Sequence, residues 1–332
     1  MDKLAVCAIG GNSLVRGPGQ ASFHDQFEIV CETARALADI AASGRQLIVT
    51  HGNGPQVGFL LIRSHLSRQR LPEIPLDVCN ALTQAEIGYM LQQALKNELR
   101  SRNIARGVVT LVTQVLVDRN DPAFANPSKP VGPFYTKREA MTLMKGLGWV
   151  MREDAGRGFR RYVPSPEPRE IVECGEIERL AKAGTIVIAV GGGGIPVLEA
   201  EVSGSRSGVG RQPLAADHRQ LTGLQGVAAV IDKDLASSLL ANRVGADLLV
   251  VSTAVEQVFV NYRKPNQSPL CRTTLAEVEE YLRAGEFPAG SMGPKIDAAA
   301  RFLKNGGERV IITDPAHLVA AMSGKAGTTI TV

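Results

Sequence analysis

Short apolar runs rich in β-branched residues recur along the chain, separated by longer stretches in which apolar positions follow a helical period. A strand covered on both faces is apolar at successive positions, so these runs predict buried strands. Because strands and helices alternate, the connections favour right-handed crossovers and a mostly parallel sheet in an α/β fold. The predicted strands are Leu4–Ile9, Gln46–Thr50, Val108–Val117, Thr185–Val190, Val227–Ile231, Leu248–Ser252, Val258–Val260, Arg309–Thr313 and Thr328–Thr331.

Capping residues mark where helices begin. Ser22 is expected to cap a helix that ends near Ser43, where Gly44 supplies a stop, and Pro55 suits the first turn of a helix after the second strand. Further helix starts are predicted from the pattern Thr-x-x-Glu, in which each side chain binds the backbone N–H of the other residue. These starts are Thr83 to Glu86, opening a helix that reaches about Arg102, Thr136 to Glu139, and Thr274 to Glu277.

Two segments depart from this alternation. Residues 118–168 are rich in proline and too irregular for a sheet core, so they predict an excursion from the main body. Residues 203–225 begin with a Gly/Ser-rich run that predicts a mobile loop. No internal repeat is found.

Glycine-dense turns follow the first, second and fourth predicted strands: Gly10-Gly11-Asn12, Gly52-Asn53-Gly54 and Gly191 to Gly194. In an open parallel sheet, ligands bind beyond the carboxyl ends of the strands. Glycine lets backbone N–H groups approach an anion, and a following helix adds its positive N-terminal end. Any one such turn is explained equally well by packing, and Asn12 or Asn53 by its tolerance of left-handed turns, but their repetition favours a phosphate site.

Composition narrows the class of protein. The chain has 332 residues, of which 44% are hydrophobic, and a net charge of +4, which is too mild to indicate a nucleic-acid partner. No apolar run reaches membrane-spanning length, so we expect no membrane partner. The five cysteines include no C-x-x-C pair, which predicts reduced, mostly buried thiols and a cytoplasmic location.

Familiar nucleotide motifs are missing. The sequence contains no G-x-x-x-x-G-K-[ST] loop and neither H-R-D nor D-F-G, which excludes P-loop NTPases and protein kinases. The spacing Gly52-x-Gly54-x-x-x-Gly58 is a loosened dinucleotide fingerprint. Its acidic partner, near Glu73 or Asp77, does not end a strand, which argues against a nicotinamide cofactor.

Lysine placement adds chemistry to the glycine turns. Only 11 of the 37 basic residues are lysine, yet Lys129, Lys233 and Lys295 each lie in a glycine-, proline- or aspartate-rich loop. A compact ammonium suits a moving phosphoryl group. For Lys129 and Lys295, the alternative is an ordinary surface position. Lys233 differs, because it comes after a predicted buried strand and is flanked by Asp232 and Asp234.

Taken together, these motifs resemble the carbamate kinases of the amino-acid-kinase family over nearly the whole chain. Other kinases of the family carry a lysine two residues before the first glycine pair, and this chain has Ala8 there. Carbamate kinases share that departure, and the lysine of their Asp-Lys-Asp turn takes over the role. The segments that carry the resemblance are Ala8–Asn12, Thr50–Gly58, Leu76–Cys79, Thr83-Gln84, Thr113-Gln114, Asn126–Phe134, Glu153–Arg160, Val163–Pro166, Gly191–Val197, Val230–Asp234 and Gly290–Lys295.

The resemblance implies a fold and a reaction. The fold is a three-layer αβα sandwich with a small protruding lid at about residues 118–168, a carbamate and phosphoryl lobe at 1–200 and a nucleotide lobe at 201–332. The reaction is ADP + carbamoyl phosphate ⇌ ATP + carbamate with Mg²⁺, in line and without a covalent intermediate. A homodimer is also implied. The supply of carbamoyl phosphate, from an arginine, agmatine or purine-derived route, stays open.

Site roles follow from the same resemblance. Lys233 would stabilise the moving phosphoryl group with Asp234 orienting it, Lys295 would hold the nucleotide phosphates, and Lys129 would reach carbamoyl phosphate from the lid. His51 is interpreted as structural. The substrate cradle would be Gly10, Gly11, Asn12, Gly52, Asn53, Gly192 and Gly193, and the adenine side Thr253, Ala254, Val255, Tyr262 and Met292.

The chain departs from the family at the segment 198–225, which is about twenty residues longer than the usual connection. The extra residues are interpreted either as a tolerated surface insertion or as an added lid or partner contact. Two alternative functions remain. One is a sibling kinase for another small carboxylate, and the other is a non-catalytic nucleotide-binding subunit, against which the complete set of lysines argues.

Overall fold

The computed structural model describes residues 3–11, 22–154, 156–201, 222–288 and 291–332. Asn12 and residues 203–221 of the predicted loop therefore lie outside the described residues, as does the larger part of the 198–225 segment. The loop prediction was wrong for residues 222–225, which pair as a strand with Leu198–Glu201. No helix in the part of the chain that is described is long and apolar enough to cross a membrane.

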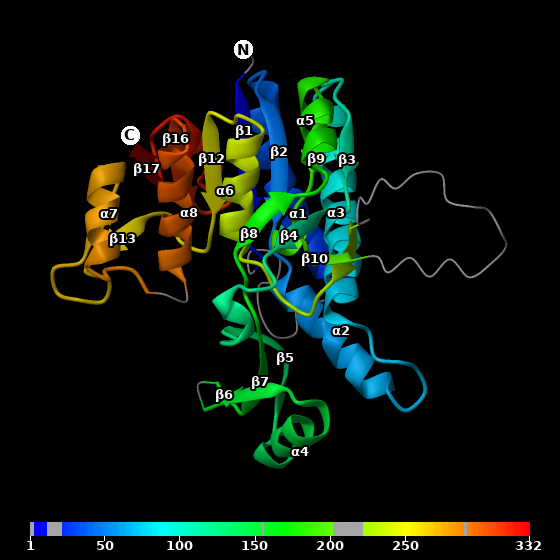
Figure 1. Cartoon of the computed structure of the whole chain (residues 1–332). Coiled ribbons are helices and arrows are strands. Elements are labelled where there is room, and N and C mark those ends of the chain that lie inside the picture. The colour runs from blue at the N-terminus through cyan, green and yellow to red at the C-terminus, as the bar shows by residue number, and fades with distance from the viewer. Residues whose placement is uncertain (1–2, 12–21, 155, 202–221, 289–290) are drawn as a thin grey trace, which may run out of the picture.

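A central eight-stranded sheet forms the body (Figure 1). Neighbouring strands are parallel, except that β16 and β17 are antiparallel. Its strands, in spatial order, are β15 (Arg272–Thr274), β17 (Thr328–Thr331), β16 (Arg309–Thr313), β12 (Leu248–Ser252), β1 (Leu4–Ile9), β2 (Gln46–His51), β9 (Ile186–Ile188) and β3 (Val108–Thr110).

Helices cover both faces of this sheet, because side chains on both faces of its central strands are buried. On β1, Ala5, Cys7 and Ile9 pack in one hydrophobic cluster with α1 and α3, whereas Leu4 and Val6 pack in a second cluster with α5, α6, α7 and α8. The structure is thus a three-layer αβα sandwich, as expected. The helices are α1 (Phe23–Ala42), α2 (Gly54–Ser67), α3 (Leu76–Ser101), α4 (Lys137–Leu147), α5 (Cys174–Lys182), α6 (Lys233–Arg243), α7 (Leu275–Arg283), α8 (Met292–Lys304) and α9 (Leu318–Met322).

Three smaller sheets surround the body. The first has the order β11 (Thr222–Gly226), β10 (Ile195–Glu201), β4 (Gln114–Val117) and β8 (Pro168–Ile171). The second has the order β5 (Lys129–Tyr135), β7 (Phe159–Val163) and β6 (Val150–Glu153). The third is the pair β13 (Val258–Val260) and β14 (Ser268–Leu270). Short 3₁₀ turns lie at Pro122–Phe124 and Gly191–Gly193.

The proline-rich excursion protrudes from one end of the body, as Figure 1 shows for α4, β6 and β7. As expected, none of it joins the central sheet, but it is more regular than its prolines suggested, since β5, β6 and β7 form an antiparallel sheet of their own. Prolines 130 and 133 fit because β5 is an edge strand whose register is interrupted between Val131 and Tyr135. Val131 and Val163 connect this unit to α2 and α3 through a separate apolar cluster.

Two of the predicted Thr-x-x-Glu helix starts are confirmed, as is the Ser22 cap, but the one at Thr83 was wrong. Helix α3 already begins after Pro75, whose φ of −58° and ψ of 152° start it. The Thr83 hydroxyl lies mid-helix and donates to the carbonyl groups of Cys79 and Asn80.

Two predicted strands also differ. The run 108–117 divides into β3 and β4, which belong to different sheets, because the chain leaves the ladder where the Thr113 N–H donates to Gln84. The run 227–231 is not a strand. Its N–H groups bond to Pro196, Val227 and Pro164 in turn, so it follows no single neighbouring strand.

Candidate active site

The edge of the sheet at which β12, β1, β2 and β9 end carries all three glycine turns. These four strands are neighbours and parallel, so their carboxyl ends meet. Gly10-Gly11 follows β1, Gly52 to Gly54 follow β2, Gly191 to Gly194 lie shortly after β9, and Thr253 to Val255 follow β12. Residues more than 240 positions apart in the chain therefore face one another, as expected for an open parallel sheet.

An open cleft of about 550 Å³ lies at this edge. It is lined by 14 of the 16 residues that the sequence assigned to the site: Gly10, Gly11, Gly52, Asn53, Lys129, Gly192, Lys233, Asp234, Thr253, Ala254, Val255, Tyr262, Met292 and Lys295. Of the other two, Asn12 is outside the described residues, and Gly193 packs behind the cleft, where a Cβ would lie 2.6 Å from the Ile231 carbonyl oxygen.

The first two glycine turns pack backbone against backbone. A Cβ on Gly52 would lie 2.6 Å from the Gly11 nitrogen, so a side chain does not fit at Gly52. Among the described residues, the N–H groups of Gly11, Asn53, Gly54 and Gly192 have no hydrogen-bond acceptor although these residues line the cleft. Unpaired N–H groups at a helix start form an anion site, and α2, α6 and α8 all begin here.

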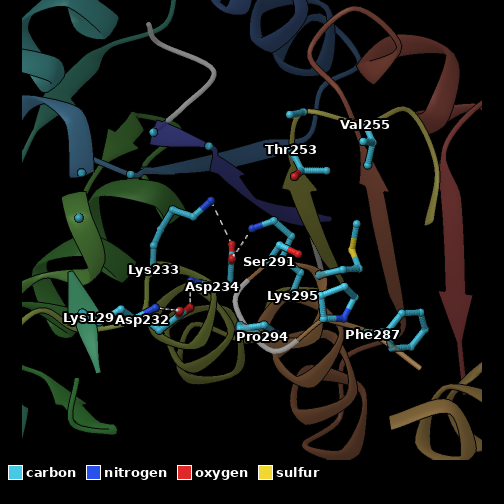
Figure 2. Close-up of a pocket in the computed structure, with 18 of the residues that line it drawn as sticks. Lys129, Asp232, Lys233, Asp234, Thr253, Val255, Phe287, Ser291, Pro294 and Lys295 are labelled. Atoms are coloured by element: carbon cyan, nitrogen blue, oxygen red, sulfur yellow. Dashed lines mark hydrogen bonds and ion pairs between the residues drawn. The ribbon is translucent and has the colours of Figure 1, made fainter. Parts of the chain in front are cut away.

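Three lysines and two aspartates supply the charges of the cleft (Figure 2). Lys233 Nζ lies 3.0 Å from Asp234 Oδ1, and Lys295 Nζ lies 2.8 Å from Asp234 Oδ2. Lys129, at the start of β5 on the protruding unit, reaches Asp232 Oδ2 at 2.9 Å. The other oxygen of Asp232 caps α6 by accepting from the Asp234 N–H at 2.9 Å.

Asp234 remains ionised throughout the neutral range. Burial alone would raise its pKa, but the ammonium groups of Lys233 and Lys295 outweigh that effect and lower the pKa to about 2. Its side chain is only 5% exposed, so neither lysine is free to move far from it. The two cations are thus held in fixed positions before any substrate arrives.

The side of the cleft beyond Asp234 is apolar. Val255, Phe287 and Pro294 border it in Figure 2, close to Ser291 and Lys295 at the start of α8. The sequence had pointed to Val255 and Met292 but missed several neighbours. These are Gln257, Phe259, Phe287, Pro288, Ser291 and Pro294. Ser291 and Pro294 belong to the segment Gly290–Lys295, in which only Met292 and Lys295 had been given a role, and the strand predicted at 258–260 placed Phe259 near the turn.

Asn53 does not point its amide at the cleft. Its Nδ2 donates to Asn80 Oδ1 at 3.0 Å and to Thr83 Oγ1 at 2.9 Å, both on α3, so its amide donors are taken.

The turn after β9 is strained, since Val190 has a φ of 53°, which costs a β-branched residue about 1–3 kcal/mol. Such strain persists only where neighbouring contacts hold it in place.

His51 is buried beneath the second glycine turn with 1% exposure. Burial, helped by the nearby Lys233 ammonium, lowers its pKa to about 4, although a hydrogen bond to the Gly52 carbonyl acts in the opposite direction. The imidazole is therefore neutral at pH 7, so Nδ1 donates to that carbonyl at 3.1 Å. This geometry supports the structural interpretation of His51.

We expect His51 to make the fold sensitive to acid. The unfolded chain binds its proton below about pH 6.5 and the folded chain only near pH 4, so the free energy of unfolding falls as pH drops through this window. Chemical unfolding at pH 7 and pH 5 should show the wild type losing about 2 kcal/mol more than His51→Asn. Equal losses in the two proteins would contradict the neutral, buried state of His51.

Comparison with known proteins agrees with this architecture. The model of the amino acid kinase family matches residues 3–314. Carbamate kinase of Pyrococcus horikoshii is 46% identical over 333 residues, covering 100% of both chains, and that of Clostridium perfringens is 44% identical, covering 98% of both.

A solved structure leads to the same family. The carbamate kinase from Giardia lamblia bound to AMP-PNP superimposes with a TM-score of 0.88 at 41% identity, over 99% of this chain and 98% of that one. The glycine turns, the buried aspartate and the lysine set thus occur in a chain whose full length aligns with such proteins. The chain belongs to the amino acid kinase family, in the group formed by the carbamate kinases.

Proposed function

We propose that this protein is a carbamate kinase, catalysing ADP + carbamoyl phosphate ⇌ ATP + carbamate. The observation that carries the proposal is the position of Lys233. Its Nζ donates to the Ile9 carbonyl at 3.3 Å, at the end of the strand in which other family members are expected to carry their lysine, while Ala8 is fully buried. Lys233 from α6 thus supplies the charge that Ala8 does not.

The charges of the cleft favour transfer between two anions. Three ammonium groups and two carboxylates leave one net positive charge before substrates bind. The glycine-turn N–H groups would hold the carbamate and the transferring phosphoryl group, with Lys233 stabilising charge as the P–O bond to carbamate breaks and the bond to the ADP β-phosphate forms. Carbamate leaves as an anion, so this step needs no general base, which agrees with the buried state of His51.

Mg²⁺ would enter as part of the nucleotide. Among the residues that the structure describes, no group of three or more His, Cys, Asp or Glu could hold a metal by itself. Asp232 and Asp234 are already paired with lysines, and Mg²⁺ commonly binds through substrate phosphates and water with few protein ligands. Lys295 and the start of α8 would hold the phosphates of Mg–ADP, with adenine among Thr253–Val255, Tyr262 and Met292.

The direct test is ATP formation from ADP, Mg²⁺ and carbamoyl phosphate. We expect ATP in proportion to carbamoyl phosphate, and less ATP when acetyl phosphate, which lacks the carbamate nitrogen, replaces it. Equal use of acetyl phosphate would favour a sibling kinase for small carboxylates. Nucleotide binding without turnover would favour a regulatory subunit.

We further propose a cytoplasmic homodimer. The five free thiols suit a reducing compartment. Exposed apolar side chains gather where α1, α2 and α3 meet, since Phe23 stacks on Tyr89 with centroids 6.3 Å apart and Arg63 of α2 interacts with Glu86 of α3. The exposed members of this surface are Phe23, Ile62, Leu66, Val78, Leu82 and Tyr89.

Charge introduced into this surface should separate the subunits. We expect Leu82→Asp to sediment as a monomer at concentrations where the wild type is a dimer, because a buried unpaired carboxylate opposes association. Val319→Asp, at an equally exposed apolar position on α9 at the far end of the chain, is the control. A wild type that sediments as a monomer, or a Leu82→Asp variant that stays dimeric, would contradict this assignment.

A further inference from the structure

The third glycine turn is held from behind by a side chain of α3 that does not reach the cleft. Gln84 is 1% exposed, and all of its hydrogen bonds go to backbone groups near this turn. We propose that Gln84 is a positioning residue for phosphoryl transfer, fixing the turn so that the Gly192 N–H faces the transferring group. The inference rests on the proposed function and assigns it a residue outside the cleft.

Gln84 bridges the backbone at Thr113 and the backbone at Gly191. Its Nε2 donates to the Gly191 carbonyl at 2.9 Å and to the Thr113 carbonyl at 3.0 Å, and its Oε1 accepts from the Thr113 N–H at 2.8 Å. One amide thus uses both N–H donors and its carbonyl in a buried position. Such fully satisfied buried networks hold a single geometry, because any shift leaves a polar group unpaired.

The turn needs this restraint. Val190 and Gly192 both have left-handed backbones, with φ of 53° and 67°, and the first of these is unfavourable for valine. The Val190 N–H donates to Thr113 Oγ1 at 3.0 Å, and Thr113 is itself held by Gln84. The strained residue is therefore anchored through Thr113 on one side and through the Gly191 carbonyl on the other.

Only the front of the turn meets the cleft. Gly192 lines it and has no acceptor for its N–H among the described residues, whereas Gln84 and Thr113 are not among the residues that line it. If Gln84 is removed, Val190 can relax and the Gly192 N–H turns away from the phosphoryl group. The residues expected to hold adenine follow β12 and β13 or begin α8, and none of the hydrogen bonds of Gln84 reaches these segments, so nucleotide affinity should not change.

The test is Gln84→Met, which keeps the side-chain length and removes every hydrogen bond. We expect kcat for ATP formation to fall at least about 10-fold, as for a misplaced catalytic group, with the Kd of Mg–ADP measured by calorimetry within about two-fold of wild type. The control is Gln92→Met on the same helix. Gln92 accepts from the Thr110 N–H at 2.8 Å, a similar bond to β3 away from the turn, and its loss should leave kcat unchanged.

A kcat within about two-fold of wild type for folded Gln84→Met would overturn the inference, as would an equal loss in Gln92→Met or a parallel loss of Mg–ADP affinity. If Gln84→Met does not fold, Thr113 decides the matter. Thr113→Val removes the acceptor of the Val190 N–H and should lower kcat, whereas Thr113→Ser keeps the hydroxyl and should restore most of it; equal rates would overturn the inference. A wild type that makes no ATP would refute the proposed function instead.

Discussion

Replacing Lys233 by methionine should lower kcat for ATP formation at least about 10²-fold, the loss typical of removing one preorganised group from a transition-state site. Methionine keeps the apolar stem and removes only the ammonium. Asp234 retains Lys295 at 2.8 Å, so its carboxylate does not become an unpaired buried charge. The effect should therefore appear in kcat and leave the melting temperature close to that of wild type.

Lys304→Met is the matched control for this experiment. Lys304 lies at the end of α8, pairs with Glu279 and has a side chain that is 56% exposed. Its loss should cost less than about 1 kcal/mol of stability and should not change kcat. Unchanged turnover in Lys233→Met would mean that the reacting phosphoryl group lies elsewhere, and loss of Mg–ADP binding alone would place Lys233 on the nucleotide instead.

The second large effect is expected at Gly192. Its φ is +67°, and a Cβ there would lie 2.2 Å from Asn53 Nδ2. Gly192→Ala should push Asn53 away from Asn80 and Thr83 and displace two of the glycine turns at once. We expect kcat to fall at least about 10²-fold, because the backbone N–H groups of two turns would no longer point at the transferring phosphoryl group.

Gly245 separates this clash from simple backbone strain. It has the same φ of +67°, follows α6 and has no atom within 4 Å of the position of a Cβ. Gly245→Ala should therefore lower the free energy of unfolding by about 1 kcal/mol with wild-type kcat. If Gly192→Ala keeps more than a tenth of the wild-type kcat, the turn is more adaptable than its packing implies.

Much of the fold could be predicted from local pattern. Strands β1, β2, β12, β16 and β17 were predicted within one residue of their ends, because a strand buried on both faces is apolar along its length and the polar turns bound it. The caps of α1, α4 and α7 were equally clear, since a capping residue acts on a helix start within three positions.

The sequence-based predictions were wrong where contacts outside a short motif override the preference of that motif. Thr83 resembles a cap, but Pro75 had already started the helix. The run 108–117 resembles one strand, but Gln84 takes the Thr113 N–H out of the ladder. The side chain of Asn53 was open to a phosphate contact or a turn role, and the structure gives its amide two acceptors on α3 instead.

Local sequence already identifies the groups from which the candidate site is built: glycine turns after buried strands, a lysine between two aspartates, and alanine at position 8. These signals are short-range, since each depends only on residues close together in the chain. Which charged groups form ion pairs, and which side chains hold the turns, depends instead on the folded chain. Lys295 reaches Asp234 across 61 positions, Lys129 reaches Asp232 across 103, and Gln84 reaches Gly191 across 107. Contacts of such separation leave no local pattern, because the parallel sheet, and not the chain, brings these residues together at one edge.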